Sequence, residues 1–224
     1  GTFFVNKYDL LTQKELNSKK FKGNIIKVDS KKVGSFLNTI DNNYFLTETN
    51  KENLSFVLEI SKKLRLKNKL LKKSVQNFKG LKYRQQIIFR EKNLTVINDS
   101  KSTSFSSSTG TLKVYPNIYW LLGGISKKND KFILPKKYYN NIRAFIYGKN
   151  KNFFNNELRG KIKSENFKNL SDALKKIFLD LKIKKFQNQT ILFSPCAASF
   201  DSFKNFEDRG FYFNKLIKKH VSRK

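Results

Sequence analysis

Short apolar segments that alternate with amphipathic ones constrain the fold of this chain more than any other feature. After Gly80 the apolar segments are residues 86–90, 94–98, 118–122, 142–148 and 190–193. Brief apolar runs bounded by Gly, Asn or Ser are typical of buried strands. Strands that alternate with helices predict a mainly parallel sheet, and hence an α/β domain.

Amphipathic segments predict helices at residues 53–66, 68–78, 171–181 and 202–219. Ser171 is a favourable N-cap for the third of these helices. Lys92 and Asn93 separate the first two strands and predict a hairpin. Gly80 interrupts the helical pattern before the first strand and marks a linker. We therefore predict two domains, residues 1–80 and 81–224.

The chain carries a formal net charge of +30, with 47 Lys and Arg residues against 17 Asp and Glu residues. Such a charge suits nucleic acid or an acidic membrane surface. However, the lysines are scattered over every predicted helix and loop, as expected if an AT-rich genome biases the composition. The sequence shows no helix-turn-helix, Cys/His zinc pattern or RNP-type aromatic motif. We therefore expect no nucleic-acid partner, although the charge can attract an anionic nucleotide.

Cysteine and histidine usage excludes other classes of protein. Cys196 is the single Cys, which rules out an internal disulfide and fits a reducing cytoplasm. His220 is the single His, and its charged surroundings predict that it is exposed. One histidine argues against a His-based triad or a zinc site, and we expect no metal site. No apolar run is long enough to insert into a membrane.

The segment at residues 97–103 follows a predicted strand and enters a helix. Ligands of α/β sheets bind beyond the carboxyl ends of strands. Asp99 can accept hydrogen bonds from ribose hydroxyls, and Lys101 and Thr103 can donate to a carboxylate or phosphate. On the local pattern alone, a helix cap beside a solvated lysine is the simpler interpretation.

The segment at residues 194–210 follows the last predicted strand and is the most distinctive part of the chain. Small residues form a tight turn, and an apolar/charged pattern then opens a helix whose N-terminus can face an anion. Phe200, Phe203 and Phe206 could equally pack in the core, and we expect this of Phe203 at least. Cys196 is interpreted as a buried packing residue rather than a nucleophile.

Three weaker patterns stand elsewhere. Gly123 and Gly124 close a buried strand and allow a ligand to approach the backbone, although a plain turn explains them. Arg84 follows the linker, and on the local pattern alone it is interpreted as a surface residue, although its guanidinium would suit a phosphate. Asn50 and Asn53 have amide side chains that can both donate and accept hydrogen bonds, and Asn50 could cap a helix.

Together these segments resemble the Mur ligases that add D-glutamate to UDP-N-acetylmuramoyl-L-alanine. The resemblance covers about residues 45–218 and is strongest at residues 97–103 and 194–210. Three residues depart from the family pattern: Thr49 and Tyr83 stand in place of His, and Ser102 in place of Ala.

The resemblance implies a role for each matching residue. Lys101 would be catalytic. The residues expected to bind D-glutamate are Thr103, Lys127, Ser199, Phe200 and Phe206. The residues expected to contact ATP are Asn50, Asn53, Arg84 and Asp99. The loop after the glycine pair carries one extra residue here, so Lys128 remains an alternative to Lys127.

The resemblance also implies the reaction of an intact enzyme in cytoplasmic peptidoglycan precursor synthesis, and hence in cell wall formation, cell shape and division. ATP would phosphorylate the carboxylate of UDP-N-acetylmuramoyl-L-alanine, and the amine of D-glutamate would attack the acyl phosphate. Residues 81–224 would be the Rossmann-like C-terminal domain, and residues 1–80 the tail of a central α/β ATPase domain.

The chain contains no Met and no G-x-x-G-K-[ST] phosphate loop. We therefore expect a piece of a longer protein, inactive alone, whose other portions hold that loop and most Mg²⁺ ligands. Two alternatives remain open. One is a related amide ligase that uses another amino acid. The other is a basic module that binds nucleic acid or other anions on a degenerate ligase scaffold.

Overall fold

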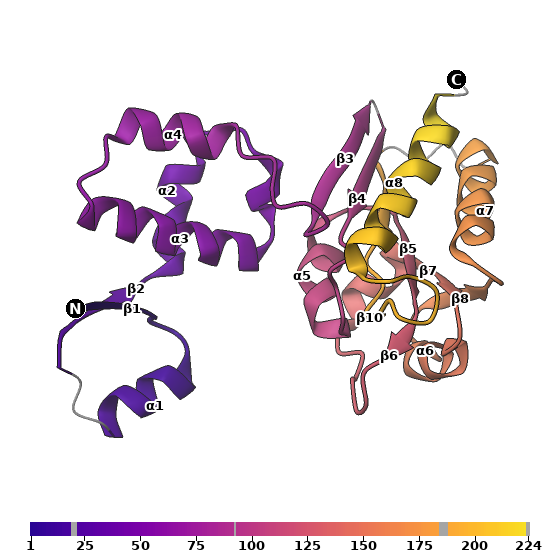
Figure 1. Cartoon of the computed structure of the whole chain (residues 1–224), viewed down its shortest axis with the longest axis horizontal. Coiled ribbons are helices and arrows are strands. Elements are labelled where there is room, and N and C mark those ends of the chain that lie inside the picture. Colours follow the sequence, from indigo (N-terminus) through magenta and orange to yellow (C-terminus); the bar gives the residue numbers. More distant parts are fainter. Residues whose placement is uncertain (19–21, 92, 184–187, 223–224) are drawn as a thin grey trace. The chain divides into compact units, whose positions relative to one another are not determined.

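The computed structural model describes residues 1–18, 22–91, 93–183 and 188–222. The chain divides into two compact units, Gly1–Phe78 and Lys79–Lys224, whose elements are labelled in Figure 1. The division lies two residues before the domain boundary that we expected at Gly80. Each unit is described by itself below.

The first unit combines a small parallel sheet with short helices. Its helices and strands are β1 (Thr2–Asn6), α1 (Leu10–Ser18), β2 (Asn24–Val28), α2 (Val33–Leu37), α3 (Glu48–Lys63) and α4 (Asn68–Gln76). Strand β1 pairs in parallel with β2. Val33, Phe45, Leu54 and Val75 form a small buried core among the helices. Helix α3 begins earlier than predicted because the hydroxyl of Thr47 accepts a hydrogen bond from the Asn50 N–H group at 3.4 Å.

The second unit is built on a mainly parallel sheet, which confirms the predicted α/β class. In the described residues the strand order is β3-β4-β9-β5-β7-β8. The strands are β3 (Gln86–Glu91), β4 (Leu94–Asn98), β5 (Ile118–Gly123), β7 (Ile142–Tyr147), β8 (Lys163–Asn166) and β9 (Gln189–Phe193). Only the β3–β4 pair is antiparallel in this sheet as described, as the predicted hairpin requires. Lys92, predicted in its turn, lies outside the described residues.

Helices cover both faces of this sheet, which explains why its central strands are apolar without interruption. Helices α5 (Phe105–Val114) and α6 (Lys151–Leu158) pack on one face, against Trp120 and Leu122 of β5. Helices α7 (Leu170–Ile183) and α8 (Phe206–Val221) pack on the other face, against Tyr119 and Leu121. Figure 1 shows α7 and α8 side by side on that face.

Two helix starts differ from the prediction because asparagines cap them. The Oδ1 atom of Asn205 accepts a hydrogen bond from the Asp208 N–H group at 2.8 Å, so α8 begins at Phe206 rather than at residue 202. Asn169 accepts likewise from the Asp172 N–H group at 2.9 Å, which places Ser171 inside α7. Among the described residues, no helix has the length and apolar character needed to cross a membrane.

Candidate functional site

The two most distinctive sequence segments meet at the carboxyl ends of β4 and β9. These strands are parallel neighbours, with Asn98 paired to Phe193 at their last residues. The chain holds them together beyond the sheet, because the Asp99 N–H group donates to the Phe193 carbonyl at 2.7 Å. The glycine turn after β5 joins the same place, since the Gly123 N–H group donates to the Pro195 carbonyl at 3.0 Å. Carboxyl ends of parallel strands are where α/β sheets bind ligands.

Asp99 lies at the centre of this junction and is 5% exposed. Its carboxylate accepts hydrogen bonds from the Ser194 hydroxyl at 2.8 Å and from the Gln85 N–H group at 3.1 Å. Burial raises the pKa of Asp99 to about 7, although these two bonds and the charges of Arg84 and Arg209 oppose the shift. Each carboxylate oxygen has two lone pairs, so both retain the capacity to accept another donor.

The segment before β3 is held against the same junction. The Lys101 N–H group donates to the Tyr83 carbonyl at 3.0 Å. Tyr83 has a φ of +62°, and its ring lies where a side chain at Gly210 would stand, 2.3 Å from the Cβ position of that residue. Gly210 therefore allows α8 to approach the Tyr83 ring. Arg84 itself is exposed, with its charge close enough to act on Asp99.

A chain of buried hydroxyls continues from Asp99 into α5. The Ser194 hydroxyl shares a hydrogen bond with that of Ser108 at 2.5 Å, and Ser108 with that of Ser102 at 3.1 Å. The Cys196 thiol lies 2.9 Å from the Ser108 hydroxyl. Ser102, which stands where the family has Ala, thus joins a network instead of making an apolar contact. Cys196 is fully buried as predicted, and burial raises the pKa of its thiol to about 12.

Arg209 of α8 makes a second connection between the two segments. Its guanidinium donates to the Ser100 carbonyl at 2.7 Å, to the Ser100 hydroxyl at 3.1 Å and to the Ala197 carbonyl at 2.9 Å. The Ser100 hydroxyl in turn donates to the Phe206 carbonyl at 2.8 Å. Arg209 is 1% exposed, so it is an internal cation of this junction.

The residues predicted to bind D-glutamate lie on segments that extend from this junction within the second unit. The ammonium group of Lys101 lies 3.8 Å from the ring centroid of Phe206, a cation–π contact. Ser199 is buried, and its carbonyl accepts from the Phe203 N–H group at 2.9 Å. Thr103 follows the Lys101 turn and is exposed. Their proposed roles toward a ligand stay predictions.

Lys127 is carried by a small sheet that belongs to the same junction. Strand β6 (Ile125–Ser126) pairs antiparallel with β10 (Ala197–Ala198), which directly precedes Ser199. Lys127 comes directly after β6, and both Lys127 and Lys128 are exposed. Lys127 therefore follows the paired residue Ser126 directly, and Lys128 lies two residues after Ser126.

The phenylalanines of residues 200–206 do not form the core that we considered as an alternative. Phe200 is 71% exposed, and Phe203 and Phe206 are half-buried outside the two hydrophobic clusters of the unit. Phe203 instead contacts the ring of Tyr212 at 5.5 Å. The expectation of core packing was therefore wrong for Phe203, because α8 turns Phe213 and Ile217 toward the sheet.

Asn50 and Asn53 lie in the first unit, on α3. Asn50 is buried and donates its amide to the Tyr44 carbonyl at 2.7 Å, while Asn53 is exposed. Thr47 is the N-cap, so the capping alternative for Asn50 was wrong. Contact of either asparagine with a nucleotide stays a prediction.

The residues that we expect to hold Mg²⁺ lie mostly outside this chain. Among the described residues there is no group of three or more His, Cys, Asp or Glu side chains that could hold a metal ion.

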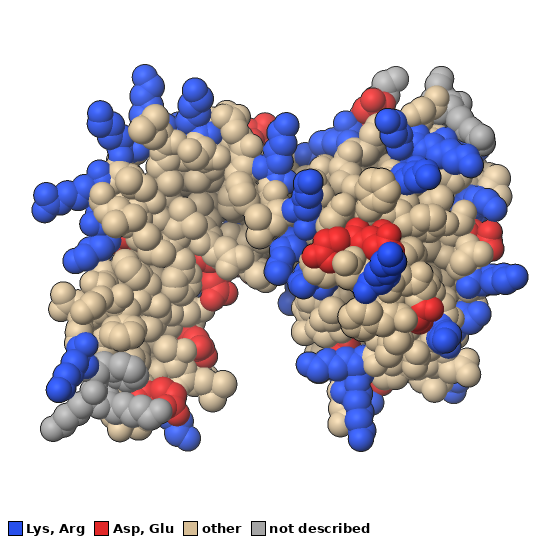
Figure 2. Space-filling model, viewed as in Figure 1, with Lys and Arg blue, Asp and Glu red and all other residues tan. Residues whose placement is uncertain are grey.

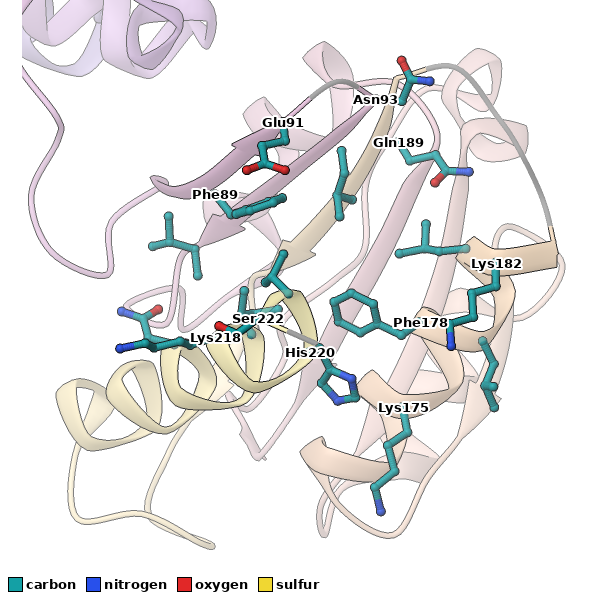
Figure 3. A pocket seen from close by; sticks show the side chains of 17 residues that line it. Phe89, Glu91, Asn93, Lys175, Phe178, Lys182, Gln189, Lys218, His220 and Ser222 are labelled. Carbon is teal, nitrogen blue, oxygen red and sulfur yellow. The ribbon is translucent and has the colours of Figure 1, made fainter. Parts of the chain in front are cut away.

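A hollow of about 1150 Å³ lies at the opposite end of the sheet, between the β3–β4 hairpin and the last turns of α7 and α8 (Figure 3). None of the predicted site residues lines it. His220 lies on its wall and stacks on Phe178, with ring centroids 4.4 Å apart. His220 is half-buried, so the expectation that it is exposed in a charged tail was wrong.

Sequence reasoning missed the two residues that organise the junction, Ser194 and Arg209. A signal for Arg209 exists in the sequence. It stands four and eight residues before Phe213 and Ile217, on the apolar face of the last helix. A charged residue on a buried face requires internal partners.

Comparisons with known proteins agree with the resemblance. The chain is 33% identical over 171 residues to the UDP-N-acetylmuramoylalanine–D-glutamate ligase of Wolbachia sp. subsp. Brugia malayi (strain TRS), covering 76% of the chain and 34% of that protein. It is 36% identical over 172 residues to the ligase of the same name from Rickettsia prowazekii (strain Madrid E), covering 76% and 38%. The chain thus spans little more than a third of the length of these relatives.

Two further comparisons add little. No protein-family model matches the chain. A crystal structure of a murein peptide ligase, Mpl, from Psychrobacter arcticus 273-4 aligns with 77% of the chain and 36% of that protein, at 11% identity and a TM-score of 0.43. Agreement at this level carries no argument about the fold.

Proposed function

We propose that this chain, which belongs to the Mur ligase family, supplies the D-glutamate site and part of the ATP site of a D-glutamate-adding ligase. The observation that carries this proposal is the meeting of residues 97–103 and 194–210 at the carboxyl ends of β4 and β9. The family resemblance is strongest in these two segments, and the fold brings them into direct hydrogen-bond contact.

In the proposed reaction ATP activates the carboxylate of UDP-N-acetylmuramoyl-L-alanine, and the amine of D-glutamate displaces the phosphate to form an amide. Lys127, Thr103 and Ser199 would orient D-glutamate, because ammonium and hydroxyl groups donate to its carboxylates. Phe200 and Phe206 would border the pocket. Holding the amine against its target contributes to the rate by removing the entropy cost of encounter.

On the nucleotide side, Asp99 would accept from the ribose and Arg84 would bind a phosphate through its planar guanidinium. Asn50 and Asn53 would contact the adenine. Lys101 would act as the catalytic cation, held near Phe206. We propose that Mg²⁺ is held mainly by residues outside this chain, as the family resemblance implies. The reaction would take place in the cytoplasm, in peptidoglycan precursor synthesis.

A titration of the purified chain tests the proposal. We expect saturable chemical-shift changes at Ser199 and Phe206 with D-glutamate, weaker changes with L-glutamate, and changes at Asp99 and Arg84 with ADP. We also expect no amide formation and no ATP hydrolysis by the chain alone, because it lacks a phosphate loop. Ligation by the purified chain would contradict this second expectation, and shifts with another amino acid would favour a different amide ligase.

The same sample tests the nucleic-acid alternative. On the face shown in Figure 2, Lys and Arg side chains are spread over many elements and are not gathered into one stripe. We therefore expect only weak binding to arbitrary RNA. Tight RNA binding that falls steeply between low and high salt, with no response to D-glutamate or ADP, would overturn the ligase proposal.

A further inference from the structure

The junction beyond β4 and β9 contains two networks of side-chain hydrogen bonds, which meet where the Ala197 N–H group donates to the Ser102 carbonyl at 3.3 Å. One consists of hydroxyls and runs from Asp99 through Ser194 and Ser108 to Ser102. The other is centred on the guanidinium of Arg209 and reaches Ser100, Ala197 and, through the Ser100 hydroxyl, Phe206. The first network fixes the residue predicted to contact the nucleotide. The second holds the backbone at Ser100, between Asp99 and Lys101, and at Ala197, two residues before Ser199.

The Arg209 network depends on the geometry of guanidinium. Two of its nitrogens donate to three oxygens from two different segments, at 2.7 to 3.1 Å. Arginine can do this because its donors are fixed in a plane, whereas lysine has a single nitrogen on a flexible stem. Bonds from a charged donor are also stronger than bonds between neutral groups.

The surroundings of Arg209 leave room for it and partly balance its charge. A side chain at Gly124 would stand 3.3 Å from the Arg209 Nη1 atom and 2.5 Å from the Ala198 carbonyl. Burial lowers the pKa of Arg209, and the nearby Tyr147 hydroxyl and Asp201 carboxylate oppose that shift. The Arg209 side chain therefore lies beside Gly124 after β5 and near Tyr147 at the end of β7, in addition to its bonds to Ser100 and Ala197.

The position of Ala197 gives Arg209 an influence on the lysine loop. The Arg209 Nη2 atom donates to the Ala197 carbonyl, and Ala197 belongs to β10, which pairs with Ser126 of β6. Lys127 follows directly. Arg209 thus holds three backbone pieces that lead to Lys127, Ser199 and Phe206, while Asp99 is held by Ser194 and Gln85.

We propose that Arg209 is a positioning residue that assembles the amino-acid pocket and leaves the nucleotide contacts to the Ser194 network. This inference rests on the proposed function. It adds a residue that touches no ligand, and it assigns the two side-chain networks to different ligands.

The test compares the full chain with its Arg209→Lys variant in titrations with D-glutamate and with ADP. We expect D-glutamate to bind at least about tenfold more weakly, because fixed charged hydrogen bonds are lost, while the dissociation constant of ADP stays within about twofold. Ser194→Ala should give the reverse pattern, with weaker ADP binding and nearly unchanged D-glutamate binding. A purely structural defect would weaken both ligands together.

Two further variants serve as controls. Arg143→Lys changes a half-buried arginine that pairs with Glu165 at 2.9 Å and Asp180 at 3.0 Å, away from the junction. It should alter neither affinity. Should Arg209→Lys fail to fold, Ser100→Ala provides the same test, because it removes only the hydroxyl between Arg209 and the Phe206 carbonyl. It should weaken D-glutamate selectively.

The outcomes separate this inference from the proposal on which it rests. Wild-type chain that does not respond to D-glutamate contradicts the proposed function, and the inference with it. If the wild-type chain binds D-glutamate and Arg209→Lys binds it equally well, the inference alone is overturned. Ser100→Ala takes the place of Arg209→Lys in this comparison if that variant does not fold. Parallel loss of D-glutamate and ADP affinity also overturns it.

Discussion

The hydroxyl of Ser194 donates a hydrogen bond to the carboxylate of Asp99 at 2.8 Å, although 95 positions separate the two residues. The contact exists because β4 and β9 are parallel neighbours and leave the sheet side by side. The Asp99 carboxyl group is buried, and burial raises its pKa to about 7.

The pKa of Asp99 predicts that the second unit loses stability as pH rises from about 4 to about 7. The ordinary pKa of this group is 3.8, so between 3.8 and about 7 the folded state keeps a proton that the unfolded state has lost. Because the folded state binds more protons in this window, the free energy of unfolding falls as pH rises. Urea unfolding at four pH values, followed by the fluorescence of Trp120, measures the effect.

Asp99→Asn is the control for this pH dependence. Asparagine cannot titrate and keeps one oxygen that can accept a hydrogen bond. We expect the variant to show a flatter stability profile than the wild-type chain between pH 4 and 7. Identical slopes in the two proteins would mean that Asp99 does not hold a proton in this window.

Cys196 is predicted to be unreactive in the folded chain. Its thiol is fully buried and its pKa is raised to about 12, so little thiolate exists at neutral pH. A thiol reagent such as DTNB should modify the native protein far more slowly than a small-molecule thiol. In guanidinium chloride the protein unfolds and the single thiol should react at once, which gives the reaction rate of the exposed thiol for comparison. Rapid modification under native conditions would contradict the burial.

Gly123 is predicted to tolerate alanine much less well than Gly160. Both have positive φ angles, +143° and +68°, so alanine is strained at either position. A Cβ atom at Gly123 would stand 2.1 Å from the Tyr147 carbonyl oxygen, whereas one at Gly160 meets nothing within 4 Å. We expect Gly160→Ala to cost about 1–2 kcal/mol and Gly123→Ala clearly more. Urea unfolding measures both, and equal losses would exclude the close approach at Gly123.

Lys127 and Lys128 form a matched pair for the D-glutamate site. Both are exposed, but Lys127 directly follows Ser126, which pairs with Ala197 and so fixes its backbone. We expect Lys127→Ala to weaken D-glutamate binding by about tenfold and Lys128→Ala to have little effect, since a charge-assisted bond contributes about that much. The opposite order would assign the ligand to Lys128.

The sheet could be predicted from the sequence because its strands are buried on both faces. Such strands appear as continuous apolar runs, as at Ile118–Gly123, and need no long-range information. The first residues of the helices were harder to predict. Asn205 and Asn169 cap α8 and α7 at positions where Ser residues nearby were equally plausible, and local geometry decides between such candidates.

The arrangement of the candidate site could be predicted only in part. The resemblance selected Asp99 and Ser199, but nothing in the sequence places Ser194 on Asp99, because that contact depends on the order of strands. Arg209 was missed because charged residues near a helix start are usually exposed to solvent. His220 was misjudged for the same reason, since its packing on Phe178 requires α7 and α8 to be adjacent.

The strand order has a consequence for the synthesis of the protein. Strand β9 is the last of the described sheet to leave the ribosome, yet it lies between β4 and β5 in the middle of that sheet. While a nascent chain still lacks residues 189–193, β4 and β5 have no partner between them and the Asp99 carboxyl has no Ser194 to bind. We therefore expect the second unit to acquire its native sheet only after most of the chain has emerged, and to need protection from aggregation until then.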